Sequence, residues 1–156
     1  MQIDLIAVGK RMPDWVNSTC QEYRKRLPAH IKLNLLEINS ANRNKKNSTD
    51  NYKLEEENYI LKKINADSYI ILFDEHGKAF SSEAFAKNLN EWSESRSHIT
   101  LIIGGPDGVS KNIKQKANEI WSLSKLTLPH PLARVVLIEQ LYRAWTIIKN
   151  HPYHRE

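Results

Sequence analysis

The positions of apolar residues divide the chain into alternating short strands and helices. Runs of apolar and β-branched residues predict strands over 3–8, 31–38, 68–73, 99–103 and 120–123. Helical spacing, with Pro or Ser near most starts, predicts helices over 13–27, 52–64, 81–95, 110–117 and 132–149. Several strands are apolar on both sides, as in a parallel sheet covered by helices. The sequence therefore predicts an α/β fold with a mainly parallel sheet and helices on both faces.

Length and composition place this pattern in one domain. The 156 residues contain no internal repeat and no linker, so residues 1–156 are expected to fold as a unit. The longest apolar run, 135–138, is far shorter than the ~20 residues of a membrane helix. The start of the chain shows no signal peptide, and the single Cys20 permits no internal disulfide. We therefore expect a cytoplasmic protein without a membrane segment.

The formal net charge of +5 is unevenly distributed. Residues 1–53 carry ten basic and five acidic side chains, residues 54–107 five and ten, and residues 108–156 eight and three. Basic ends around an acidic middle suggest a polyanionic partner, although scattered solvated charges would give the same totals. Asparagine and basic residues fill 39–51, which predicts a mobile basic loop.

Candidate binding residues follow three of the predicted strands, at the edge where parallel sheets bind ligands. They are Phe73-Asp74, the glycine-rich turn 104–108 and the segment 123–128. The glycine turn is neither a dinucleotide fingerprint nor a P-loop, and on its own it is more typical of a plain tight turn than of a binding site. Segment 123–128 mixes apolar and hydroxyl residues, so it could line a pocket for a heterocycle or form a buried crossover.

The last predicted helix is apolar nearly all round, which suggests a second packing partner besides the sheet. A two-fold dimer is the common reason, and a central position within one chain is the alternative. Among its few charged residues, Glu139 and Arg143 are four apart and are expected to pair.

The C-terminal tail is unusually rich in functional side chains. Tyr153 could stack on a base, His154 titrates near neutrality, and Arg155 could bind phosphate or a base edge. A frayed terminus is the alternative. The histidines show no metal-ligand spacing, and no serine-hydrolase motif is present, so no metal is expected.

Six motifs together carry a resemblance that spans the whole chain in order. They lie at 7–10, 12–15, 103–108, 126–130, 142–144 and 153–155. In these motifs the chain resembles the ribosomal large subunit methyltransferase H family, SPOUT-class enzymes that methylate N3 of a pseudouridine in 23S rRNA. The resemblance implies a homodimer acting on the ribosome, a C-terminal trefoil knot, and S-adenosylmethionine as methyl donor.

The resemblance also assigns roles to individual residues. The implied cofactor contacts are Phe73, Gly104, Leu123, Ser124, Lys125, Leu126, Thr127 and Leu128. Phe73 departs from the aliphatic residue expected there. The methyl group is already electrophilic, so no metal is required, and the enzyme must supply an in-line approach and a deprotonated N3.

Four residues are the catalytic candidates. Arg155 would stabilise the ring anion, His154 would remove the proton or position the nucleotide, and Tyr153 would stack. His130, beside the cofactor loop, is a second candidate base. If the tail reaches the partner's cofactor, the active site is shared between subunits.

Two other functions remain open at this stage. A non-catalytic ribosome-associated RNA-binding protein would explain the basic ends and the tail, but not the apolar character of 123–128. A SPOUT methyltransferase acting on tRNA would differ only in its substrate.

Overall fold

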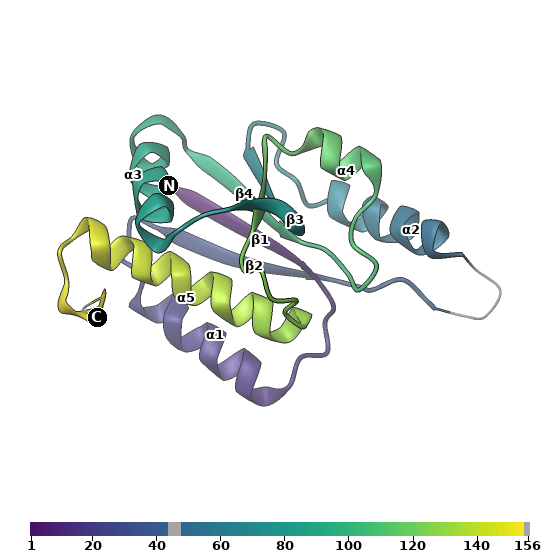
Figure 1. Ribbon diagram of the computed structural model, residues 1–156, viewed down its shortest axis with the longest axis horizontal. Helices are drawn as coiled ribbons and strands as arrows, with labels where there is room; N and C mark the ends of the chain where they lie inside the picture. The colour runs from purple at the N-terminus through teal and green to yellow at the C-terminus, as the bar shows by residue number, and fades with distance from the viewer. Residues whose placement is uncertain (44–47, 155–156) are drawn as a thin grey trace.

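The computed structural model describes residues 1–43 and 48–154, which form alternating strands and helices (Figure 1). The strands are β1 (Gln2–Val8), β2 (Lys32–Ile38), β3 (Tyr69–Ala79), β4 (His98–Ile103) and β5 (Glu119–Ser122). The helices are α1 (Asp14–Arg26), α2 (Thr49–Leu61), α3 (Ser82–Ser95), α4 (Lys111–Lys116), α5 (His130–Ile148) and the short 3₁₀ helix η1 (Pro152–His154).

The five strands form one sheet in the order β2-β1-β4-β3-β5, and every pairing is parallel. Helices α1, α3 and α5 cover one face, and α2 and α4 cover the other (Figure 1). The predicted α/β fold with helices on both faces is therefore confirmed. The trefoil knot in the C-terminal part stays an expectation from the resemblance.

Alternation along the strands builds two cores. Ile3 and Leu5 of β1 face the α1, α3 and α5 side, whereas Ile6 and Val8 face α2 and α4. Burying each such side chain contributes about 1.5–3 kcal/mol. Cys20 is buried in the first core, and burial raises the pKa of its thiol, as expected for a packing residue.

β3 is longer than the apolar pattern predicts. The strand was expected to end before Asp74, but it continues to Ala79, with a register shift against β5 between Phe73 and Lys78. Asp74 accepts a hydrogen bond from the backbone N–H of His76 at 2.9 Å, which stabilises the irregular stretch. Gly77 lies so close to the Trp121 backbone that no side chain fits there. This polar continuation is exposed, so hydrophobic periodicity could not reveal it.

The loop predicted over 39–51 is shorter in the structure. Ala41 is buried, and its N–H donates to the carboxylate of Glu56 at 2.9 Å. At the other end, α2 begins at Thr49 because the side chain of Ser48 accepts a hydrogen bond from the N–H of Asn51. Residues 44–47 of the predicted loop lie outside the described residues. The segment is thus anchored on both sides.

α5 lies between α1 and α3 against the sheet (Figure 1). The single chain therefore covers most of its circumference, which favours the central position over the dimer as the main reason for its apolar sequence. The predicted pair of Glu139 and Arg143 is confirmed, with 2.8 Å between the two groups.

A buried arginine joins the first turns of α5 to the sheet. Only 1% of the Arg134 side chain is exposed. Its guanidinium donates to the carboxylate of Glu37, at the end of β2, and to the carbonyl oxygen of Gly9, just after β1, at 3.0 Å. A charge this deeply buried is tolerated only when it is paired.

Replacing Arg134 by Met tests this link. The variant leaves the Glu37 carboxylate and the Gly9 carbonyl without their donor, so the free energy of unfolding should fall by about 2–3 kcal/mol. Urea denaturation followed by circular dichroism measures the loss. Arg26→Met removes an arginine from the exposed pair with Glu22 and should leave the midpoint nearly unchanged. Equal midpoints for Arg134→Met and the unaltered chain would contradict the assignment.

Candidate active site

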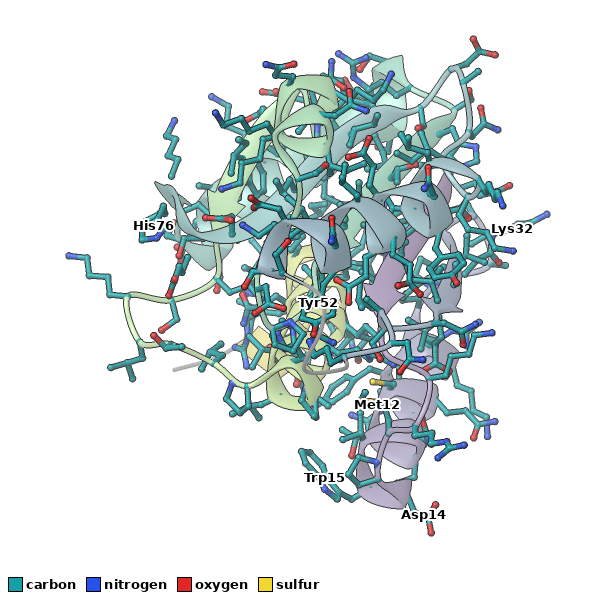
Figure 2. All side chains as sticks on the ribbon, turned by 90° about the vertical axis from the view of Figure 1, so that its right-hand side faces the viewer. Met12, Asp14, Trp15, Lys32, Tyr52 and His76 are labelled. Carbon is teal, nitrogen blue, oxygen red and sulfur yellow. The ribbon has the colours of Figure 1, made fainter. Side chains whose placement is uncertain are left out.

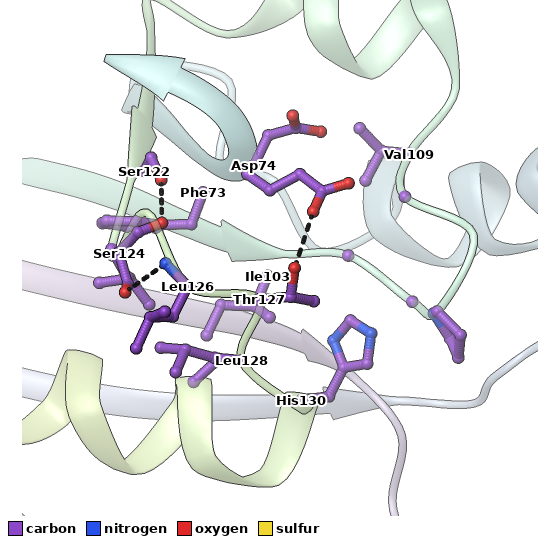
Figure 3. Close-up of a pocket in the computed structure, with 17 residues that line it drawn as sticks. Phe73, Asp74, Ile103, Val109, Ser122, Ser124, Leu126, Thr127, Leu128 and His130 are labelled. Atoms are coloured by element: carbon purple, nitrogen blue, oxygen red, sulfur yellow. Dashed lines mark hydrogen bonds between the residues drawn. The ribbon is translucent and has the colours of Figure 1, made fainter. Parts of the chain in front are cut away.

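The three segments singled out from the sequence meet at one pocket on the carboxyl edge of the sheet (Figure 3). Its volume is about 200 Å³. It is lined by the ends of β3, β4 and β5, the turns that follow them and the start of α5: Phe73, Asp74, Glu75, Ile103, Gly104, Gly105, Pro106, Gly108, Val109, Ser122, Leu123, Ser124, Leu126, Thr127, Leu128, His130 and Ala133.

The structure brings together nearly all of the residues predicted to contact a cofactor. Phe73, Gly104 and the residues of 123–128 all line this pocket except Lys125, whose side chain is exposed. The ring of Phe73 packs edge-on against Phe80 and Trp121, each at 6.3 Å between centroids. The core thus accommodates the aromatic residue that departs from the family pattern.

Hydrogen bonds within the loop explain the hydroxyl residues of 122–128. The Ser122 hydroxyl donates to the carbonyl of Ser124 at 2.9 Å, and the Ser124 hydroxyl accepts from the N–H of Leu126 at 2.9 Å. These bonds turn the chain so that Leu126 is 76% exposed at the rim of the pocket. An apolar side chain this exposed beside a pocket is suited to contact a ligand or a second chain.

The turn over 104–108 needs glycine because its chain is packed so closely that side chains on Gly104 and Gly105 would clash with their neighbours. A Cβ on Gly104 would lie 2.6 Å from Cγ1 of Val109. The N–H of Gly108 donates to the carbonyl of Gly105 at 2.9 Å, and Gly108 has a φ of 78°, in the left-handed region that favours glycine. The turn therefore leaves its backbone open to the pocket.

Two carboxylates lie on one side of the pocket, and one of them is paired with a lysine. Asp74 lies 3.4 Å from the Lys114 ammonium, and Glu75 accepts a hydrogen bond from the Thr127 hydroxyl at 3.5 Å (Figure 3). The apolar side chains around 123–128 form the opposite wall. The pocket can therefore hold a ligand with an apolar part and a cationic part.

His130, the first residue of α5, forms another wall of the pocket (Figure 3). Its Nδ1 is buried and has no hydrogen-bond partner among residues 1–43 and 48–154. Burial lowers the pKa of the imidazole below its usual value of 6.5. The ring is therefore neutral at pH 7 and can accept a proton.

A charged network behind the glycine turn was not predicted from the sequence. Glu56 is 2% exposed and accepts hydrogen bonds from the Ala41 N–H and from Arg43, which also pairs with Asp107 at 2.9 Å. The Glu56 carboxylate fills the space where a side chain on Gly105 would lie. Only the helical spacing could have indicated that Glu56 is buried, because Glu56 lies four residues before the buried Ile60 and therefore on the same face of α2.

The tail lies at the opposite end of α5 from the pocket (Figure 1). α5 has 19 residues, so about 28 Å of helix separates His130 from the tail. Within one chain, Tyr153 and His154 are therefore not brought together with the pocket. Arg155 lies outside the described residues.

Tyr153 packs on its own chain. Its hydroxyl forms hydrogen bonds with Glu139 at 3.0 Å and Tyr23 at 3.1 Å, and its ring lies edge-on against Tyr142 at 4.7 Å. Burial and these bonds raise the pKa of its hydroxyl far above the usual value, so the group stays protonated. The Nδ1 of His154 is buried without a hydrogen-bond partner in the described part of the chain.

Within residues 1–43 and 48–154, no group of three or more His, Cys, Asp or Glu side chains could hold a metal ion. The same residues include no helix that is both long enough and apolar enough to cross a membrane.

Comparison with known proteins identifies the family. A family model described as "Predicted SPOUT methyltransferase" matches residues 1–154. Three similar proteins are each named "Ribosomal RNA large subunit methyltransferase H". That of Saccharophagus degradans is 49% identical over 99% of this chain and 100% of its own length. That of Hydrogenovibrio crunogenus is 46% identical over 100% of both, and that of Legionella pneumophila (strain Paris) 47% over 99% of both. The chain therefore belongs to the SPOUT methyltransferase family, in its ribosomal RNA large subunit methyltransferase H group.

Proposed function

We propose that this protein transfers a methyl group from S-adenosylmethionine to N3 of a pseudouridine in 23S rRNA. The observation that carries the proposal is the convergence of Phe73, the 104–108 turn and the 123–128 segment on one pocket. Those are the positions that the family resemblance assigns to the cofactor. The full-length similarity to proteins named as large-subunit rRNA methyltransferases supports the substrate class.

The pocket residues fit this cofactor. Apolar side chains of 123–128 can contact the adenine ring, and the open backbone of Gly104 allows close approach. The carboxylates of Asp74 and Glu75 favour a ligand that carries a sulfonium and an ammonium charge. Bound there, the cofactor supplies an activated methyl group.

The protein has to orient the target base and to hold, next to N3, a side chain that accepts the N3 proton. His130 presents a neutral imidazole to the pocket, so it can accept the N3 proton at neutral pH. His154 is the other candidate, either as base or for nucleotide positioning. Arg155 would stabilise negative charge on the ring carbonyls as N3 loses its proton. Tyr153 would stack on the base once its ring leaves Tyr142 of its own chain.

We propose that the active site is shared between the two subunits of a homodimer. One chain separates its tail from its pocket by the length of α5, so the tail residues can act only on a partner's pocket. The pocket volume of about 200 Å³ is also below the ~300–1,000 Å³ usual for small-molecule sites, as expected when one wall is missing. Exposed Trp15 on α1 and Leu132 on α5 provide apolar surface for the contact (Figure 2 shows Trp15 projecting from the molecule).

We propose that this domain recognises a preformed surface of the ribosome in the cytoplasm. The alternative without catalysis is an RNA-binding protein. Calorimetry with S-adenosylmethionine distinguishes them, because a protein that only binds RNA releases no heat with this ligand.

The activity is tested by incubating the protein with tritium-labelled S-adenosylmethionine and ribosomes that lack this modification. Label should appear in 23S rRNA, and mass mapping should place it on N3 of a single pseudouridine. Label in tRNA alone would assign a different substrate. No transfer to any RNA would contradict the proposed function.

The shared site predicts complementation between two inactive variants. Leu126→Arg puts a cation at the pocket rim and should repel the cationic cofactor, whereas Arg155→Ala should keep cofactor binding but lower turnover at least about 100-fold. Mixed by unfolding and refolding together, the two should regain about a quarter of the wild-type activity, since half of the dimers then hold one complete site. Activity no higher than in the separate variants would contradict the shared site.

The pH dependence of kcat tests His130 as the base. A base must be neutral, and burial lowers the pKa of His130, so kcat should hold down to about pH 6.5 and fall only at lower pH. His130→Gln should lower kcat about 10²–10⁴-fold and remove this acid limb, with little change in cofactor affinity. An unchanged kcat would exclude His130 as the base and leave His154.

A further inference from the structure

A second cavity of about 730 Å³ adjoins the pocket on the same edge of the sheet. It lies at the carboxyl ends of β1 and β2, beside the pocket at the ends of β3, β4 and β5. Pro106 and His130 belong to the walls of both. A molecule in the second cavity would therefore be a direct neighbour of the methyl-transfer site.

Two positively charged side chains of the cavity have no partner within residues 1–43 and 48–154. Lys10 and Arg11, directly after β1, line it, and both are exposed. Neither side chain has a hydrogen bond, ion pair or ring contact with any other residue in 1–43 and 48–154. Arg26, Arg43, Arg134 and Arg143, by contrast, are engaged in ion pairs. Two adjacent cations without partners are available to bind an anion.

The remaining walls offer a surface for a flat ring. Tyr59 is partly exposed in the cavity, and its hydroxyl donates to Glu55 at 3.4 Å, which fixes the ring. Met12, which follows β1, also lines the cavity. An aromatic ring and a thioether beside two cations suit a base with its attached phosphate.

The hydrogen bonds and ion pairs of Glu56 and Arg43 fix the position of the cavity wall relative to the glycine turn of the pocket. Arg43, which also lines the cavity, is held by Glu56 at 3.2 Å and by Asp107, which lies in the glycine turn of the pocket, at 2.9 Å. Glu56 also holds Ala41, another cavity residue. The wall of the cavity is thus bonded to the turn of the pocket.

We propose that the second cavity binds a nucleotide of the substrate RNA adjacent to the target base, with its phosphate on Lys10 and Arg11 and its base against Tyr59. The inference rests on the proposed function and adds a substrate-binding subsite to it. The cavity holds the RNA strand while the target base is presented to the cofactor in the neighbouring pocket, and the shared wall at His130 sets the spacing between the two nucleotides.

The test compares the double variant Lys10→Ala/Arg11→Ala with the wild type. The KM for ribosomes in methyl transfer should rise at least about tenfold, with kcat at saturating ribosomes and S-adenosylmethionine affinity unchanged. Binding of a fluorescent hexauridylate, followed by anisotropy, should weaken as well. The slope of log affinity against log salt should become less steep by about 0.7, the value for the loss of one phosphate contact on a single strand.

Lys32→Ala/Lys87→Ala is the matched control, because it removes two exposed lysines away from the cavity, Lys32 at the start of β2 and Lys87 on α3. It should leave both the KM and the salt slope near wild type. An equal change in the two double variants, or a KM within twofold of wild type for Lys10→Ala/Arg11→Ala, would overturn the proposal. Weaker ribosome binding with unchanged hexauridylate binding would also overturn it, since the cavity would then contact a ribosomal protein.

The two proposals fail separately. If the wild-type protein methylates no RNA, the proposed function is wrong, yet the hexauridylate measurement still decides whether Lys10 and Arg11 bind RNA. If the wild type methylates 23S rRNA and the double variant has an unchanged KM and salt slope, only the subsite is wrong.

Discussion

The buried guanidinium of Arg134 is the interaction on which the geometry of the site depends. It joins the first turns of α5 to the ends of β1 and β2, through Gly9 and Glu37. His130, one turn earlier on α5, is the wall between the pocket and the second cavity. A hydrogen-bonded ion pair sets a defined position, at the cost of desolvating the charges.

The length of α5 separates the pocket at its first residue from the tail after its last turn. Its first residue faces the pocket, and its last turn leads into the tail, about 28 Å away. Tyr153 is held against α1 and α5 of its own chain by its hydroxyl bonds. In the proposed mechanism the pocket would bind the methyl donor and the tail would supply residues for the nucleotide, so a complete site would need two chains.

The sequence predicted the elements and the ligand-binding edge, because apolar periodicity and the ends of parallel strands are local features. It placed Phe73, Gly104 and 123–128 at one edge, and they line one pocket. It missed the continuation of β3 past Asp74, which is polar and exposed. It also missed Glu56 and the role of Arg134, whose partner Glu37 is 97 residues away. Such long-range polar contacts leave no periodic signal, and an acidic residue in a charged helix looks like part of a solvated face.

The most direct test of the shared active site is photo-crosslinking from the pocket rim. Leu126, which is 76% exposed at the pocket rim, would be replaced by benzoylphenylalanine in subunits of normal isotopic mass. These subunits would then be mixed with unmodified subunits labelled with heavy isotopes. The shared site predicts crosslinks between light and heavy chains that map to residues 150–156. Crosslinks confined to the labelled chain, or reaching only other segments of the partner, would contradict it.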